Sequence, residues 1–527
     1  MGNMIRRNIT LFWLLPALVL CGAGREQQVF SQQIENTIDS LSHKIVWVNR
    51  RIAQETWKSL TTGQSDSLQF FVDFERYLVS DPQTASKLAQ AGSQVTNEEM
   101  KRRLYILNSL IQTGRVDQSS AVTDLRDSIY NAYQAFAADF EGEVRSQQFL
   151  MNIVRTDPDQ SRREMAYRAY TAVGSEVSDM CERLFRLRNQ IAQKAGYNNY
   201  FSLAFAGRDP GLNDYVALIG KVDSLTAEPY NAILQRLRAQ QPTGDVEIWD
   251  LYHAYAPALA RLDQYIPVDS EMDYAKAGLR DIGIDLDNLP IYLYITEDNA
   301  AAPFAMSLIV DSPDDQRIIG NLNAGFQSTQ MIMDAIGYAV SSAHTVETDP
   351  LFTMIQMQPF KSGVGHIFSD FVADTAWLRR YTTTPQTVLN GVVDAERDRR
   401  IIELRLLLTD IMFEYESYQN PGRDLNQVYW DMVEKYAYLP RHDDIMPWAA
   451  DLTFVTDPLS LNDDLIGRII ARQTMHYLYR TNGTVVGNRE TRAFLVQNYF
   501  RFGSRYGWRE LLNRGTTEGF DPAYLVK

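Results

Sequence analysis

The chain has 527 residues, of which 22% are charged and 45% are hydrophobic, a balance typical of folded globular proteins and not of disordered ones. Acidic residues outnumber basic residues by 66 to 51, and the resulting net charge of −15 argues against a protein built to bind nucleic acid. Two cysteines cannot form a disulfide framework or a thiolate zinc site, and six histidines are the only imidazoles available to a metal.

Residues 1–23 predict a secretory signal. Two arginines at positions 6 and 7 precede an apolar run over residues 11–20, which is too short to span a bilayer as a mature helix. The tetrapeptide at 18–21 resembles a bacterial lipobox, in which Cys21 would be lipidated; ordinary cleavage near Ala23, which removes Cys21, is the alternative. We therefore expect an exported protein, either periplasmic or held at the outer membrane by a lipid anchor.

The remaining residues, 24–527, predict a mainly α-helical protein. Apolar residues recur at spacings of three and four over 31–60, 68–92, 98–114, 118–155, 160–195, 212–240, 246–263 and 270–284, and again from 328 to 514. Only the segment 290–324 has β character, with short apolar or alternating runs at 290–296, 304–310 and 317–322. We expect one small antiparallel sheet inside a single large domain.

Five segments carry a family resemblance. Residues 162–200 end in GYNNY, residues 304–321 begin with FAMSLIVD, and residues 331–340 read MIMDAIGYAV. Residues 447–458 begin with PWA, and residues 487–524 begin with GNR and include WRELL. Their order and spacing resemble the zinc peptidases related to angiotensin-converting enzyme (peptidyl-dipeptidase A) and to the thimet oligopeptidases. The resemblance implies a two-lobed helical ellipsoid with a central channel, formed by residues 24–527.

In that family the helix after the sheet carries H-E-x-x-H, whose histidines bind zinc and whose glutamate activates water. The corresponding window, residues 334–338, reads DAIGY: Asp334 and Tyr338 stand in the histidine positions, and Ala335 stands in the position of the general base. By the same resemblance His366 falls at the third-ligand position, and Asp370 at the position of the carboxylate behind the ligands. The segment 452–464 also lacks the histidine and tyrosines that stabilise the family's oxyanion.

These replacements remove zinc activation of water, general-base assistance worth roughly 10²–10⁴-fold, and oxyanion donors worth roughly 10²–10³-fold. We therefore expect a catalytically inactive homologue with no catalytic residue and no cofactor. Asp334, Tyr338 and His366 would then form a hydrogen-bonded polar cluster. The alternative is a remodelled metal site with carboxylate, phenolate and imidazole ligands.

The segment that lines the family's substrate cleft persists while the catalytic residues do not. By resemblance, Phe304, Ala305, Met306 and Ser307 are the expected substrate-binding residues. The leading hypothesis is a pseudoenzyme that binds peptides in its channel. Two alternatives remain: an active peptidyl-dipeptidase or oligopeptidase that uses zinc at a non-standard site, and a cell-envelope scaffold that binds a protein partner through its surface.

Overall fold

The computed structural model describes residues 15–92, 95–241, 244–298 and 302–527, and it describes side chains from residue 32 onward. Residues 1–14 of the expected signal segment lie outside the described residues, and so does the side chain of Cys21. Among the helices that are described, none is both long enough and apolar enough to cross a bilayer.

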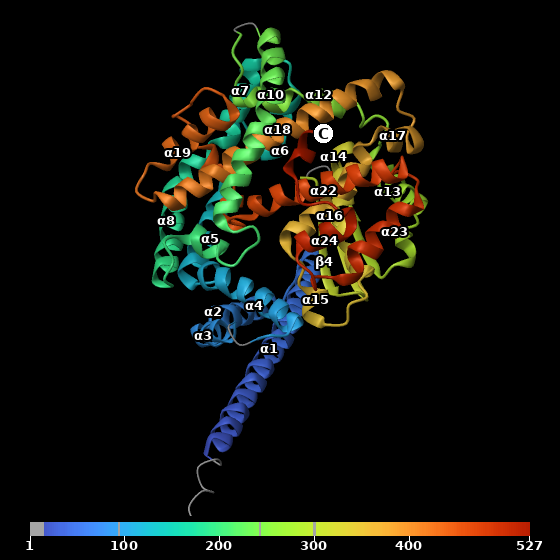
Figure 1. The fold of residues 1–527 in the computed structure, drawn as a ribbon. Helices are drawn as coiled ribbons and strands as arrows, with labels where there is room; N and C mark the ends of the chain where they lie inside the picture. The colour runs from blue at the N-terminus through green and yellow to red at the C-terminus, as the bar shows by residue number, and fades with distance from the viewer. Residues whose placement is uncertain (1–14, 93–94, 242–243, 299–301) are drawn as a thin grey trace, which may run out of the picture.

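The described chain is mainly helical, as its periodicity predicts (Figure 1). The N-terminal helices are α1 (Leu15–Thr62), α2 (Leu68–Ser80), α3 (Pro82–Ala91) and α4 (Glu98–Asp117). The helices before the larger sheet are α5 (Ser120–Ala135), α6 (Gln147–Thr156), α7 (Gln160–Thr171), α8 (Val173–Lys194), α9 (Tyr200–Phe205), α10 (Leu212–Gln240), α11 (Ile248–His253), α12 (Ala256–Ala260) and α13 (Glu271–Asp281).

The helices after that sheet are α14 (Phe326–Ala343), α15 (Pro350–Met354), α16 (Gln358–Ala373), α17 (Thr375–Tyr381), α18 (Gln386–Gln419), α19 (Leu425–Met432), α20 (Pro447–Ala450), α21 (Thr453–Thr456), α22 (Ser460–Asn482), α23 (Arg489–Asn498) and α24 (Trp508–Thr516). Figure 1 shows α5, α8, α10 and α19 on one side of the molecule and α13, α16, α17 and α23 on the other. The long helix α18 contacts α10 from the first group and α17 from the second, so it connects the two sides.

Two hydrophobic cores hold these elements together. The larger core runs from Val116 to Leu525 and includes residues from both groups of helices. The smaller core joins α1–α4 to Leu351 and Phe352 of α15. The N-terminal helices are therefore attached to the rest of the chain through buried apolar contacts, which stabilise the folded state by about 25 cal/mol per Å² of apolar surface removed from water.

The expected small sheet is present, but its topology differs from the prediction. Its strands are β3 (Ile291–Thr296), β4 (Phe304–Asp311) and β5 (Asp315–Asn321), in the spatial order β3-β5-β4. β4 and β5 pair antiparallel across a tight turn, whereas β3 pairs parallel with β5. The prediction of a purely antiparallel sheet is wrong because β3 does not pair with its neighbour in sequence, and β4 is left as an edge strand.

A second departure lies inside the stretch 118–155, which the periodicity assigns to one helix. The structure places a hairpin there, formed by β1 (Ala138–Phe140) and β2 (Glu143–Arg145). Its two-residue turn has φ of 58° at Glu141 and 80° at Gly142, the pair of positive values that a type I′ hairpin turn requires. The turn residues therefore override the helical spacing on either side.

Close helix packing brings the expected site residues together. Helix α16 lies between α14 and α22, and glycines occupy the contact points. A Cβ atom at Gly365 would lie 2.2 Å from Asp334 Oδ1 and 2.7 Å from the Tyr338 hydroxyl oxygen. A Cβ at Gly467 would lie 2.8 Å from the backbone nitrogen of Gly363. Larger residues at these positions would push the helices apart. The glycines therefore allow α16 to lie close to α14 and to α22.

Candidate functional site

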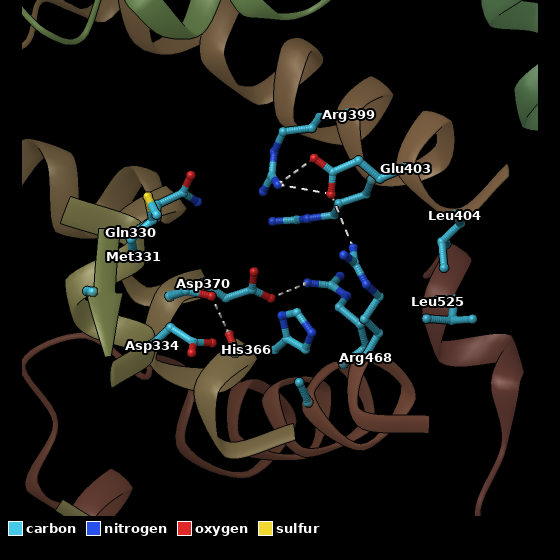
Figure 2. Close-up of a pocket in the computed structure, with 15 residues that line it drawn as sticks. Gln330, Met331, Asp334, His366, Asp370, Arg399, Glu403, Leu404, Arg468 and Leu525 are labelled. Atoms are coloured by element: carbon cyan, nitrogen blue, oxygen red, sulfur yellow. Dashed lines mark hydrogen bonds and ion pairs between the residues drawn. The ribbon is translucent and has the colours of Figure 1, made fainter. Parts of the chain in front are cut away.

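A cavity of about 340 Å³, here called the central pocket, lies where β4, α14, α16, α18 and α22 meet (Figure 2). Its lining is Ala305, Gln330, Met331, Asp334, His366, Ser369, Asp370, Arg399, Arg400, Glu403, Leu404, Arg468, Ala471, Arg472 and Leu525. The size is that of a small ligand site, and the lining mixes apolar side chains with charged ones.

Three of the positions singled out by the family resemblance line this pocket. Asp334 comes from α14, whereas His366 and Asp370 lie one turn apart on α16, and Figure 2 shows all three on the same side of the cavity. Tyr338 is hydrogen-bonded to Asp334 one turn further along α14. Ala335 is buried in the larger core and does not line the pocket. The structure therefore gathers Asp334, Tyr338 and His366 at one place, as the i, i+4 spacing on α14 suggests.

The chemistry of Asp334 and Tyr338 is that of a closed hydrogen-bonded pair. Burial raises the pKa of Asp334, and the nearby charge of His366 offsets part of that rise. Burial and the adjacent carboxylate raise the pKa of the Tyr338 hydroxyl. The phenol therefore stays protonated and donates a hydrogen bond to Asp334. A protonated phenol is a poor metal ligand, and Lys361 Nζ lies over its ring at 5.0 Å from the ring centre.

His366 is bonded to a carboxylate. Its Nε2 lies 2.6 Å from Asp464 Oδ1, and Asp464 also accepts hydrogen bonds from Ser362 Oγ at 3.0 Å and Arg468 Nε at 2.8 Å. Burial lowers the pKa of His366, but the charge of Asp464 and their hydrogen bond outweigh it, and the net pKa is raised. The imidazole is therefore held toward its protonated form, which has no lone pair for a metal.

The ion pairs continue from Asp464 across the pocket. Arg468 Nη1 lies 3.1 Å from Glu403 Oε2, and Arg399 Nη1 lies 3.1 Å from Glu403 Oε1. Arg399 is also 2.7 Å from Glu396 Oε2. This chain of charges, which we call the ion-pair network, joins α16, α18 and α22. Opposite charges surround each member, and such mutual pairing is what allows charged groups to be buried.

The members of this network on α18 and α22 were not among the residues predicted from the sequence. A local signal was present: Glu396, Arg399 and Glu403 are spaced by three and four residues, and so are Asp464 and Arg468, which places each set on one helix face. The pairing of these two faces with each other and with His366 depends on how the helices pack. Within the part of the chain that the structure describes, no three His, Cys, Asp or Glu side chains are grouped so as to hold a metal ion.

The predicted substrate strip Phe304–Ser307 forms the first half of β4 and borders two cavities. Ala305 lines the central pocket, whereas Ser307, with Leu308 and Ile309, lines a second cavity of about 340 Å³, here called the side groove. Phe304 is exposed and Met306 is half-buried; neither lines either cavity. β4 therefore runs from the central pocket into the side groove.

The side groove opens onto a third cavity of about 780 Å³. The two share five lining residues, among them Lys361 and Asp463. Asp464 lines the third cavity, while its partners His366 and Arg468 line the central pocket. The His366–Asp464–Arg468 contact therefore lies between the central pocket and the third cavity.

No family model matches the chain, and no curated protein matches it.

Proposed function

We propose that this chain is an exported, non-catalytic homologue of the zinc peptidases it resembles, and that it binds peptides along β4. The observation that supports this most is the contrast within one site. His366, which the family resemblance puts at the third metal ligand, is bonded to Asp464 of the ion-pair network, whereas cavities stay open at both ends of the segment that corresponds to the substrate strip. Such a site can hold a ligand.

Edge strand β4 supports a peptide ligand in particular. An edge strand has backbone N–H and C=O groups that no neighbouring strand pairs with, and extended peptides bind such edges by adding a strand. Helix α1 covers part of β4 near its end, where Arg50 pairs with Asp311 at 2.5 Å. The first half of the strand, residues 304–307, is the part that the peptide would follow between the cavities.

Selection of a random peptide library on the purified protein, followed by calorimetry on the enriched peptides, tests the proposal. Ala305→Trp would fill part of the central pocket, and Ser307→Trp would fill part of the side groove. We expect each variant to weaken peptide binding at least tenfold, because the indole would occupy the ligand's space. Ser224→Trp, at an exposed position on α10, is the matched control and should bind normally.

The two alternative functions predict other outcomes. Cleavage of fluorogenic peptides that EDTA abolishes would support an active metallopeptidase and contradict a non-catalytic role. Absence of saturable peptide binding together with stable co-purification of an envelope protein would support a scaffold. Peptide binding that neither tryptophan variant affects would refute the placement of the ligand along β4.

Export and lipidation form a separate part of the proposal. Mass spectrometry of the mature N-terminus distinguishes a diacylglyceryl-modified Cys21 from cleavage near Ala23. We expect Cys21→Ser to abolish detergent-phase partitioning if the lipobox is used. A full-length N-terminus on the mature protein would refute both processing routes.

A further inference from the structure

We propose that Arg400 and Arg472 form a carboxylate-binding subsite inside the central pocket, which selects acidic ligands. The inference deepens the proposed function and rests on it, since it names the chemical group that the bound peptide presents there. The carboxylate would come from an acidic side chain or from a free C-terminus.

Arg400 and Arg472 approach the pocket from different helices and are incompletely paired. Both line the cavity, Arg400 from α18 and Arg472 from α22. Arg472 Nη1 lies 3.6 Å from Asp370 Oδ2, a long ion pair, and Arg400 has no ion pair or hydrogen bond to any side chain among the described residues. The Nε atoms of both arginines are buried without a hydrogen-bond partner in that same part of the chain.

Arg400 and Arg472 have fewer direct partners than the other charged groups around the pocket. In the ion-pair network, Arg399 and Arg468 are paired with Glu396, Glu403 and Asp464, and His366 is bonded to Asp464. Arg400 and Arg472 share only Asp370, whose pKa is lowered despite its burial, chiefly by the charge of Arg400 and next by that of Arg472.

No other carboxylate among the described residues pairs directly with Arg400 or Arg472. Asp374 lies near enough to Arg400 to feel its charge, but its carboxylate accepts the Ala376 N–H as the cap of α17 and does not line the pocket. Asp334 lines the pocket and accepts the Tyr338 hydroxyl. The two guanidinium groups therefore keep donors for the carboxylate of a ligand.

Mutual repulsion makes the empty arrangement unfavourable. Burial lowers the pKa of Arg472, and the charge of Arg400 lowers it further. A carboxylate between two guanidinium groups relieves that repulsion and accepts hydrogen bonds in the planar, two-pronged geometry that arginine offers. The rest of the lining includes Met331, Leu404, Ala471 and Leu525, whose apolar surfaces would contact the carbon atoms that carry the carboxylate.

Isothermal titration calorimetry with three short peptides, which differ in whether and where they carry a carboxylate, tests the inference. The first probe is a short alanine peptide with a central glutamate, acetylated and amidated at its ends. The second replaces the glutamate by glutamine. The third contains alanine alone and has a free C-terminal carboxylate. We expect the first or the third probe to bind about 10- to 100-fold more tightly than the second, since hydrogen bonds to charged groups contribute that much. Whichever binds tightly identifies the source of the carboxylate.

Variants assign the effect to the two arginines. Arg400→Gln and Arg472→Gln should each abolish the preference over the glutamine peptide, and Arg400→Lys should retain part of it by keeping the charge without the planar fork. Arg397→Gln, on the exposed face of the same helix, is the matched control and should keep the full preference. Circular dichroism on each variant shows that it is folded.

The outcomes separate this inference from the proposed function. Equal binding of all three probes would overturn the carboxylate subsite and leave peptide binding in place. Binding of glutarate with no binding of any peptide would support the subsite and contradict the peptide ligand. Absence of binding by the three peptides and by glutarate at millimolar concentration would overturn both.

Discussion

A buried glutamate of α13, Glu271, lies beside the start of α14, the helix that carries Asp334, and its burial leads to a quantitative prediction. Glu271, at the first position of α13, is fully buried; its Oε1 accepts the Gly325 N–H at 2.9 Å and its Oε2 accepts the Ser328 hydroxyl at 2.6 Å. Burial raises its pKa from 4.5 to about 7, more than the two hydrogen bonds lower it. The perturbation is Glu271→Gln, which keeps the size and an acceptor for Gly325 but cannot ionise.

The sign and size follow from the two pKa values. Because the folded chain holds this proton more tightly than the unfolded chain, the contribution to stability is fully present below pH 4.5 and is lost as the pH rises to about 7 and above. At 1.36 kcal/mol per pKa unit, the loss amounts to about 3 kcal/mol. The variant lacks this loss. The free energy of unfolding of the natural protein should therefore fall relative to that of the variant by about 3 kcal/mol between pH 4.5 and pH 8.

Urea denaturation followed by circular dichroism at a series of pH values measures that difference. Hydrogen exchange of the backbone at residues 325–329 provides a local readout, because these residues begin α14 beside the glutamate. Glu228→Gln, at an exposed position of α10, is the control and should show no such pH-dependent difference. A constant difference between the natural protein and Glu271→Gln across the whole pH series would refute the reasoning.

Three further predictions concern the central pocket. Asp464→Asn should destabilise the protein by about 1–3 kcal/mol, because Arg468 and His366 lose the carboxylate between them; an unchanged melting temperature in calorimetry would contradict this. Gly365→Ala should destabilise the protein by about 1–3 kcal/mol, because the added methyl group would overlap Asp334. The control Gly391→Ala, with open space around it on α18, should be neutral or slightly stabilising in the same urea denaturation assay. Equal effects of the two substitutions would contradict the close contact at Gly365. Elemental analysis with a zinc titration should give no stoichiometric zinc, and tightly bound zinc that His366→Ala removes would overturn the assignment of a polar cluster.

Much of the fold could be predicted from local patterns. The helical periodicity and the bounds of β3, β4 and β5 agree with the structure to within a few residues, because both depend on near neighbours in the chain. The hairpin β1–β2 was missed since its signal is a single pair of turn residues, Glu141 and Gly142, inside an otherwise helical stretch. The pairing of β3 with β5 could not be inferred, because strand order depends on contacts between segments distant in sequence.

The residues missing from the expected zinc helix can be read directly from the chain: residues 334–338 contain no histidine and no glutamate, and no arrangement in space can change that. What lies beside these positions depends on how the helices pack. His366 meets Asp464, which lies 98 residues away in the chain, and Arg468 meets Glu403, which lies 65 residues away. The physical reason is that an ion pair needs its charges within about 4 Å. For His366 and Asp464 that distance depends on the glycines that let α16 and α22 pack closely.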